Sequence, residues 1–133
     1  MKINKLWKYS GILLVATGIL HTVVGIVLFL PYLWAIIKNG LFNALWVSWE
    51  VGFDADLSFA FWFLLCGIII IILGQILHYY IKKEQKPAPA FLAYWFLGMS
   101  AIGCIIIPVS GFWLFIPQAL IIIVGNKKRL SGV

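Results

Sequence analysis

The sequence predicts an all-α fold: an integral membrane bundle of four transmembrane helices with an amphipathic interfacial segment on its outer face. Three observations support this prediction, and two of them concern composition. Of the 133 residues, 64% are hydrophobic and only 11% are charged, whereas a soluble domain carries about 25% charged residues. The third observation is that nine of the ten cations lie in three short clusters that flank long apolar stretches. The clusters are Lys2, Lys5 and Lys8; Lys82, Lys83 and Lys86; and Lys127, Lys128 and Arg129.

The basic clusters predict the topology. Positively charged loops stay on the cytoplasmic side of a membrane, so both termini and the loop at residues 82–89 are expected in the cytoplasm of a multi-pass cell-membrane protein. Three of the four acids, Glu50, Asp54 and Asp56, lie in a segment whose only cation is Lys38, and this segment is expected outside. The net charge of +6 is then explained by topology and by contact with anionic lipid of the bilayer, and it does not indicate a nucleic-acid partner.

Four spans are expected within a single membrane domain, residues 1–133, at about 10–30, 57–81, 90–107 and 112–125. The first contains about 20 apolar residues, which is the length needed to cross the hydrocarbon. No small-x-small cleavage site follows it, so we expect it to be retained and not removed as a signal peptide. The last span is short, which implies local thinning of the bilayer or a turn buried among neighbouring helices.

Capping and turn residues set the span boundaries. Pro31 is expected to end the first span. Asp56 is expected to cap the start of the second span, with Asp54 near the positive end of the helix dipole. Pro108 marks the outer turn between the last two spans, and Pro117 is expected to bend the fourth.

The outer segment at residues 32–53 is unusual for a loop because it is rich in aromatic residues. These are Trp34, Phe42, Trp46 and Trp49. Polar residues recur in the segment at helical spacing and a mainly apolar stripe accompanies them, which predicts an interfacial helix on the outer leaflet. A re-entrant segment is the alternative, and it would bring Glu50 towards the interior of the bundle.

His21 is the main candidate for chemistry, because an ionisable side chain inside a span costs several kcal/mol unless it is sheltered or neutral. Three interpretations are open: a neutral histidine hydrogen-bonded across a helix interface, a ligand or proton-relay group, and a lipid-exposed side chain. Glycines at helical spacing accompany His21, and small residues at such spacing let a second helix approach closely. The glycines expected to pack helices are Gly11, Gly18 and Gly25 in the first span and Gly67 and Gly74 in the second.

No metal site and no cofactor are predicted. His78 lies roughly 12 Å from His21 along the membrane normal, so one ion or one haem does not suit both, and no other group of residues has metal-ligand spacing. Cys66 and Cys104 are expected at different depths as free thiols. Polar residues expected to form weak interhelical hydrogen bonds are Thr17, Thr22, Gln75, Ser100 and Gln118.

The run from Gly18 to Gly25, GILHTVVG, lies in a first span that is followed by an aromatic outer loop and three further spans. This arrangement resembles a family of small bacterial four-helix membrane proteins of unknown function. The resemblance covers nearly the whole chain, and it implies no catalytic residue because no activity is established for that family. The size is also similar to that of small multidrug-resistance transporters, but their first span carries a membrane-embedded glutamate and this one has no acid.

Two function classes follow from these observations. The favoured one is a protein that acts by association with itself or with a larger membrane partner, through the glycine seams and the outer aromatic segment. The alternative is a binder or carrier of a small lipophilic or cationic molecule, in a pocket lined by His21, Trp62, Trp95 and Gln118 and closed by the segment that contains Glu50. An enzyme is the weakest interpretation, since no acids, histidines and cysteines gather at one depth. Pairing of Glu50 with His21 would require the outer segment to dip inward, and no catalytic residue is predicted.

Overall fold

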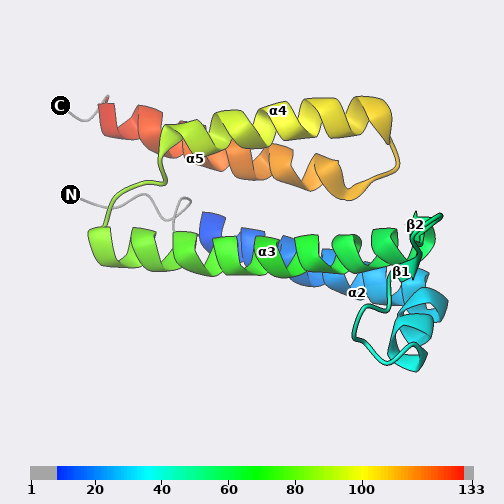
Figure 1. Ribbon diagram of the computed structural model, residues 1–133. Helices are drawn as coiled ribbons and strands as arrows, with labels where there is room; N and C mark the ends of the chain where they lie inside the picture. The colour runs from blue at the N-terminus through cyan, green and yellow to red at the C-terminus, as the bar shows by residue number, and fades with distance from the viewer. Residues whose placement is uncertain (1–8, 131–133) are drawn as a thin grey trace.

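The structure is a computed structural model that describes residues 9–130, and these residues form four α-helices, one 3₁₀-helix and one β-hairpin (Figure 1). In chain order the elements are α2 (Ser10–Lys38), β1 (Trp46–Ser48), β2 (Gly52–Phe53), α3 (Ala55–Glu84), α4 (Ala90–Ile106), η1 (Gly111–Leu114) and α5 (Phe115–Leu130). The basic cluster of Lys2, Lys5 and Lys8 lies outside the described residues.

The helices form two antiparallel hairpins that lie side by side (Figure 1). In the first hairpin α2 packs along α3, and in the second α4 packs against η1 and α5. The linker at residues 85–89 lies at one end of the molecule, together with the last turn of α5, whereas the β-hairpin and the α4–α5 connection lie at the opposite end (Figure 1). The described loops are therefore divided between two ends of a helical bundle.

The helix α2 continues through Pro31, so the expectation that this proline ends the first helix is wrong. The helix is 29 residues long, and the N–H of Asn39 closes it by donating to the carbonyl oxygen of Ala35 (2.9 Å). A proline removes one backbone hydrogen bond, but the helical ladder can resume on both sides of it. Residues 32–38 consequently belong to α2 and not to the outer segment.

The remainder of the outer segment is not helical, so the interfacial helix expected within residues 32–53 is a second correction. Three residues after α2 have positive φ angles, which a right-handed helix does not allow, so the chain cannot continue as a helix there. They occur at Gly40, Leu41 and Asn43. The β-hairpin then forms around aromatic pairs, because the ring of Trp46 lies 5.1 Å from that of Trp49 and 5.2 Å from that of Phe53.

The start of α3 is capped by Asp54, whereas the sequence favoured Asp56. Asp54 has an extended backbone, and its Oδ1 accepts from the N–H of Leu57 (2.9 Å). Asp56 instead lies in the first helical turn, where a carboxylate is stabilised by the helix dipole. The two aspartates thus exchange the roles that were predicted for them.

The second hairpin is closed by an aromatic turn. Ser100 Oγ donates to the carbonyl oxygen of Phe112 (3.0 Å), and the ring of Phe112 fills the space beside Gly103 where a Cβ atom would lie. Pro117 falls in the first turn of α5, where a helix has no intrahelical N–H bond to lose. It therefore costs α5 no intrahelical hydrogen bond, and the bend expected at Pro117 stays a prediction.

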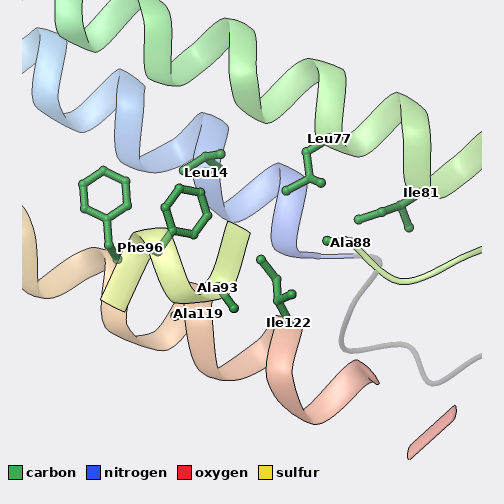
Figure 2. Close-up of a cluster of buried hydrophobic side chains, with 9 residues drawn as sticks. Leu14, Leu77, Ile81, Ala88, Ala93, Phe96, Ala119 and Ile122 are labelled. Atoms are coloured by element: carbon green, nitrogen blue, oxygen red, sulfur yellow. The ribbon is translucent and has the colours of Figure 1, made fainter. Parts of the chain in front are cut away.

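A cluster of buried apolar side chains joins the two hairpins (Figure 2). Leu14 of α2 and Leu77 and Ile81 of α3 point towards α4 and α5. The cluster consists of Leu14, Leu77, Ile81, Ala88, Ala93, Phe96, Phe115, Ala119 and Ile122. Asn126 adds a polar contact at this end, because its Nδ2 donates to the carbonyl oxygen of Ala88 (2.9 Å).

The two hairpins differ in length. α2 and α3 have 29 and 30 residues, and both are long and apolar enough to cross a membrane by length and composition. α4 and α5 are apolar but shorter, with 17 and 16 residues.

Candidate functional site

The contact between α2 and α3 is built from alternating glycines. Five successive contacts occur along α2 at steps of three or four residues, and each one joins a glycine to a larger residue. The pairs are Gly11 with His78, Val15 with Gly74, Gly18 with Ile71, Thr22 with Gly67, and Gly25 with Phe63 and Leu64. A Cβ atom at Gly18 would lie 2.8 Å from the backbone nitrogen of Ile71, and one at Gly74 would lie 2.6 Å from that of Val15. The two backbones therefore approach as closely as glycine allows.

All five predicted packing glycines lie in this one contact, which we call the glycine seam. They are buried between two helices of the same chain. A second protein cannot reach them unless α2 and α3 separate. The glycine seam is thus an internal surface, and an association surface has to be sought elsewhere on the molecule.

His21 lies beside the glycine seam and is partly buried. Its Nε2–H donates to the backbone oxygen of Phe63 (3.1 Å), and the two rings stack with centroids 4.0 Å apart and planes 13° from parallel. Nε2 carries the proton in this contact because a carbonyl oxygen can only accept. A Cβ atom at Gly67 would lie 3.2 Å from His21 Cδ2, so the glycine leaves room for the ring. The contact matches the first of the three interpretations of His21, in which the side chain forms a hydrogen bond across a helix interface.

Gln118 connects the two hairpins. Its side chain is buried, and Nε2 donates to Thr17 Oγ1 (2.8 Å) on α2. Thr17 Oγ1 in turn donates to the backbone oxygen of Leu13 (2.9 Å). Thr17 and Gln118 were predicted to form interhelical hydrogen bonds, and this contact confirms it; Thr22 instead donates to Gly18 within its own helix.

The other residues of the predicted pocket are not gathered around His21. Trp62 on α3 and Trp95 on α4 are 58% and 69% exposed and lie on outer helix surfaces. Glu50 is exposed in the turn between β1 and β2. The β-hairpin precedes Ala55, whereas His21 contacts Phe63, about 12 Å further along α3. The acid/base pair of Glu50 with His21 is therefore not formed.

The remaining titratable residues are also dispersed. His78 packs against Gly11, and its Nδ1 is buried without a hydrogen-bond partner among the described residues. Cys66 is exposed and Cys104 is half-buried, and both are free thiols. Within residues 9–130, no three His, Cys, Asp or Glu side chains lie close enough together to hold a metal ion.

The sequence did not identify one partner in these contacts, Phe63, or one pairing, that of Gln118 with Thr17. Phe63 accepts the hydrogen bond of His21 through a backbone oxygen, which every residue possesses, so no side-chain signal identifies it. Gln118 and Thr17 were both recognised as polar, but they are 101 residues apart in the chain. A single sequence does not indicate such a pairing.

The chain belongs to a family of unknown function, DUF6463, whose model matches residues 5–129. No curated protein and no solved structure matches the chain. The match confirms the resemblance to an uncharacterised family that was inferred from the run Gly18 to Gly25.

Proposed function

We propose that the protein is a multi-pass membrane protein that acts by association with a second membrane protein or with a second copy of itself. The observation that supports association is the open surface around Gly98 on α4. No atom outside its immediate chain neighbourhood lies within 4 Å of the position that a Cβ atom would take there. This open glycine is the opposite of the five glycines in the seam, which are all in contact.

Support for the membrane location comes from the outside of the two long helices, which is covered by large apolar side chains. Residues that are between 47% and 70% exposed include Ile19, Leu20, Val23, Val27, Ile68, Ile69, Ile72 and Ile76. Exposing so much apolar surface to water is unfavourable, whereas lipid tails solvate it. The apolar outer surface therefore favours hydrocarbon as the surrounding medium.

Charge supports a defined orientation. Lys82, Lys83 and Lys86 lie near the linker end of the bundle, and Glu50 and Asp54 lie at the β-hairpin end. Basic residues are retained on the cytoplasmic side. We propose that the linker end is cytoplasmic and that each hairpin crosses the membrane twice, which gives four spans.

The second hairpin is short for a crossing. Helices of 17 and 16 residues extend about 25 Å, compared with about 30 Å of hydrocarbon. η1 precedes α5 directly and adds four residues to the same passage. Slight thinning of the bilayer around α4 and α5 accounts for the remaining difference.

The association surface that we propose is the outer face of α4. Trp95, Gly98, Ile102 and Ile105 follow one another at steps of three or four residues and are all exposed. A small residue between larger ones lets a second helix approach closely in lipid, where packing drives association. The occupant of this face is an apolar transmembrane helix.

The test compares Gly98→Leu with Ala16→Leu, a matched substitution at an exposed small residue on α2. Two fluorescently labelled copies are expressed together in cells, and energy transfer between them is measured in carbonate-washed membranes. The apparent mass of the complex is then measured in a mild detergent. We expect a complex larger than one chain for the wild type and for Ala16→Leu, and a single chain for Gly98→Leu.

Energy transfer in the wild type would identify a second copy as the partner, and a large complex without energy transfer would identify a different protein. A wild type that is monomeric by both measurements would contradict association. Loss of the chain from carbonate-washed membranes would contradict the membrane location itself.

A further inference from the structure

Gln75 is a polar side chain on the exposed surface of α3, and apolar residues flank it on both sides in the chain. The sequence predicted an interhelical hydrogen bond for it, but its side chain forms none within residues 9–130. Leu77 points towards the second hairpin (Figure 2), and residues two apart on a helix point about 200° from one another. Gln75 therefore faces away from the second hairpin. An amide exposed to hydrocarbon is unfavourable without a partner, so the surroundings of α3 have to supply one.

Gln75 belongs to a stripe of α3 that is exposed over its whole length. The residues of this stripe follow one another at alternating steps of four and three, which places them on one face of the helix. They are Ile68 (47% exposed), Ile72 (49%), Gln75, Tyr79 (63%) and Lys82. Towards the linker end, the stripe thus changes from aliphatic side chains to an amide, a phenol and an ammonium group. A phospholipid has a matching order, from hydrocarbon chain to ester to phosphate.

Two ammonium groups lie at the polar end of this stripe. Lys82 is part of the stripe, and the Nζ of Lys83 lies over the ring of Tyr79, 5.5 Å from its centroid. Glu84 is two residues beyond Lys82 and therefore on the opposite side of the helix, where its Oε2 lies 3.8 Å from the Nζ of Lys86. Among the described residues, neither Lys82 nor Lys83 forms an ion pair. The polar end of the stripe is positively charged and suits a phosphate group.

The spacing along the helix also suits a lipid. Gln75 lies about 10 Å from Lys82 along the axis, and the polar layer of one leaflet is about 5–8 Å thick. With the Lys82 ammonium group at the level of the phosphates, Gln75 lies at the edge of the hydrocarbon. Ester carbonyl groups of phospholipids lie at this boundary, and a carbonyl oxygen accepts the hydrogen bond that the Gln75 amide offers.

We propose that this face of α3 binds an anionic phospholipid of the cytoplasmic leaflet. An acyl chain lies along Ile68 and Ile72, and the Nε2–H of Gln75 donates to an ester carbonyl oxygen. The phosphate lies beside Lys82 and Lys83. A lipid needs no cavity for this contact, because it lies along an exposed helix face. The site rests on the membrane location and orientation proposed above, and it does not involve the association face of α4.

The test uses phosphatidylglycerol with a diazirine on its acyl chain, and phosphatidylcholine with the same chain as a probe without net charge. Each probe is added at rising mole fraction to phosphatidylcholine nanodiscs that contain the full chain, and labelled residues are identified by mass spectrometry. We expect the phosphatidylglycerol probe to label Ile68 and Ile72 to saturation. Unlabelled phosphatidylglycerol should prevent this labelling, whereas soluble glycerol phosphate should not. Labelling by the uncharged probe should rise in proportion to its mole fraction.

Variants separate the site from general attraction of charge. Lys82→Gln should raise the mole fraction of phosphatidylglycerol at half-saturation about fivefold, the effect of one lysine beside anionic lipid. Lys86→Gln is the matched control, because it removes the same charge at the same end of the molecule from a residue in the linker that pairs with Glu84; it should change little. Gln75→Leu leaves the charge unchanged and should raise the half-saturation point about threefold, whereas Gln75→Asn keeps an amide and should lose less.

Proportional and equal labelling of Ile72 by the two probes would overturn the site, and so would equal shifts for Lys82→Gln and Lys86→Gln. The same experiment reports on the membrane location separately. Leu20 of α2 is 52% exposed, and it points away from α3 because it lies two residues beyond Gly18, which contacts α3. Both probes should label Leu20 without saturation. Absence of label at Leu20 would contradict the membrane location itself, whereas failure at Ile72 alone would contradict only the lipid site.

Discussion

The two hairpins pack their helices by opposite means. In the first, glycines of α2 and α3 alternate along the contact, and Gly11, Gly18 and Gly74 lie directly against the backbone of the opposite helix. In the second, an aromatic ring fills the interface: Phe112 covers Gly103, and the rings of Phe96 and Phe115 lie 5.4 Å apart. The tightest contacts of the first interface therefore include backbone atoms, which cannot move independently, whereas the tightest contact at Gly103 in the second is with a side chain.

This difference affects how each hairpin tolerates change. A Cβ atom added at Gly11, Gly18 or Gly74 would lie less than 3.0 Å from backbone atoms of the opposite helix, and relief requires a whole helix to shift. A Cβ atom added at Gly103 would overlap with Phe112 Cγ, so relief requires the half-buried side chain of Phe112 to turn about its χ1 torsion. Glycine on the outer face of α4 meets nothing at all. The same substitution at three sites should consequently give three different results.

The largest effect is expected for Gly18→Ala. The new Cβ would lie 2.7 Å from Ile71 Cγ1 and 2.8 Å from its backbone nitrogen. Overpacking of this kind destabilises a protein by about 2 kcal/mol. The matched control is Gly98→Ala, which adds a methyl group in open space and should stabilise α4 by up to about 1 kcal/mol through helix propensity. Unfolding by denaturing detergent measures both, and a loss of stability of similar size in the two variants would contradict the distinction between the hairpins.

A smaller loss, about 1 kcal/mol, is expected for Gly103→Ala, because the half-buried side chain of Phe112 can turn about χ1 whereas a helix backbone cannot move alone. In a Phe112→Ala background the same substitution should cost little, since removal of the Phe112 Cγ leaves room for the methyl group. The midpoint of unfolding in the same denaturing detergent provides the measurement. An equal loss from Gly103→Ala in the wild-type and Phe112→Ala backgrounds would mean that Phe112 is not the side chain that Gly103 accommodates.

The sequence predicted the small residues of the first hairpin but not the pairing between them. Glycines at steps of seven residues are visible in the chain, and helical geometry places them on one face. Which glycine meets which large residue depends on the length of the connection between the helices. Pro31 was expected to lengthen that connection, and because α2 continues to Lys38 the connection is shorter than predicted.

The candidate pocket was predicted less well. Trp62 and Trp95 were expected to line it because aromatic faces can hold a cation. Both residues are exposed on outer helix surfaces, and the direction in which a tryptophan points depends on how the helices pack, which a single sequence does not specify. Gln118 was identified correctly as a residue of interest because a polar side chain in an apolar helix requires a partner. Its partner, Thr17, was found only when the fold brought the two helices together.

The smallest effect is expected at His21, whose hydrogen bond to Phe63 joins α2 to α3 within the first hairpin. The variant His21→Leu loses the hydrogen bond to Phe63 and should be destabilised by about 0.6 kcal/mol, the average for such bonds in membrane proteins. The variant His21→Asn retains a donor and should lose less. Association, measured by energy transfer or complex mass, should be unchanged in both, because the glycine seam holds α2 against α3 without the imidazole. If His21→Leu lost association while the unfolding midpoint stayed within error, the imidazole would itself take part in association.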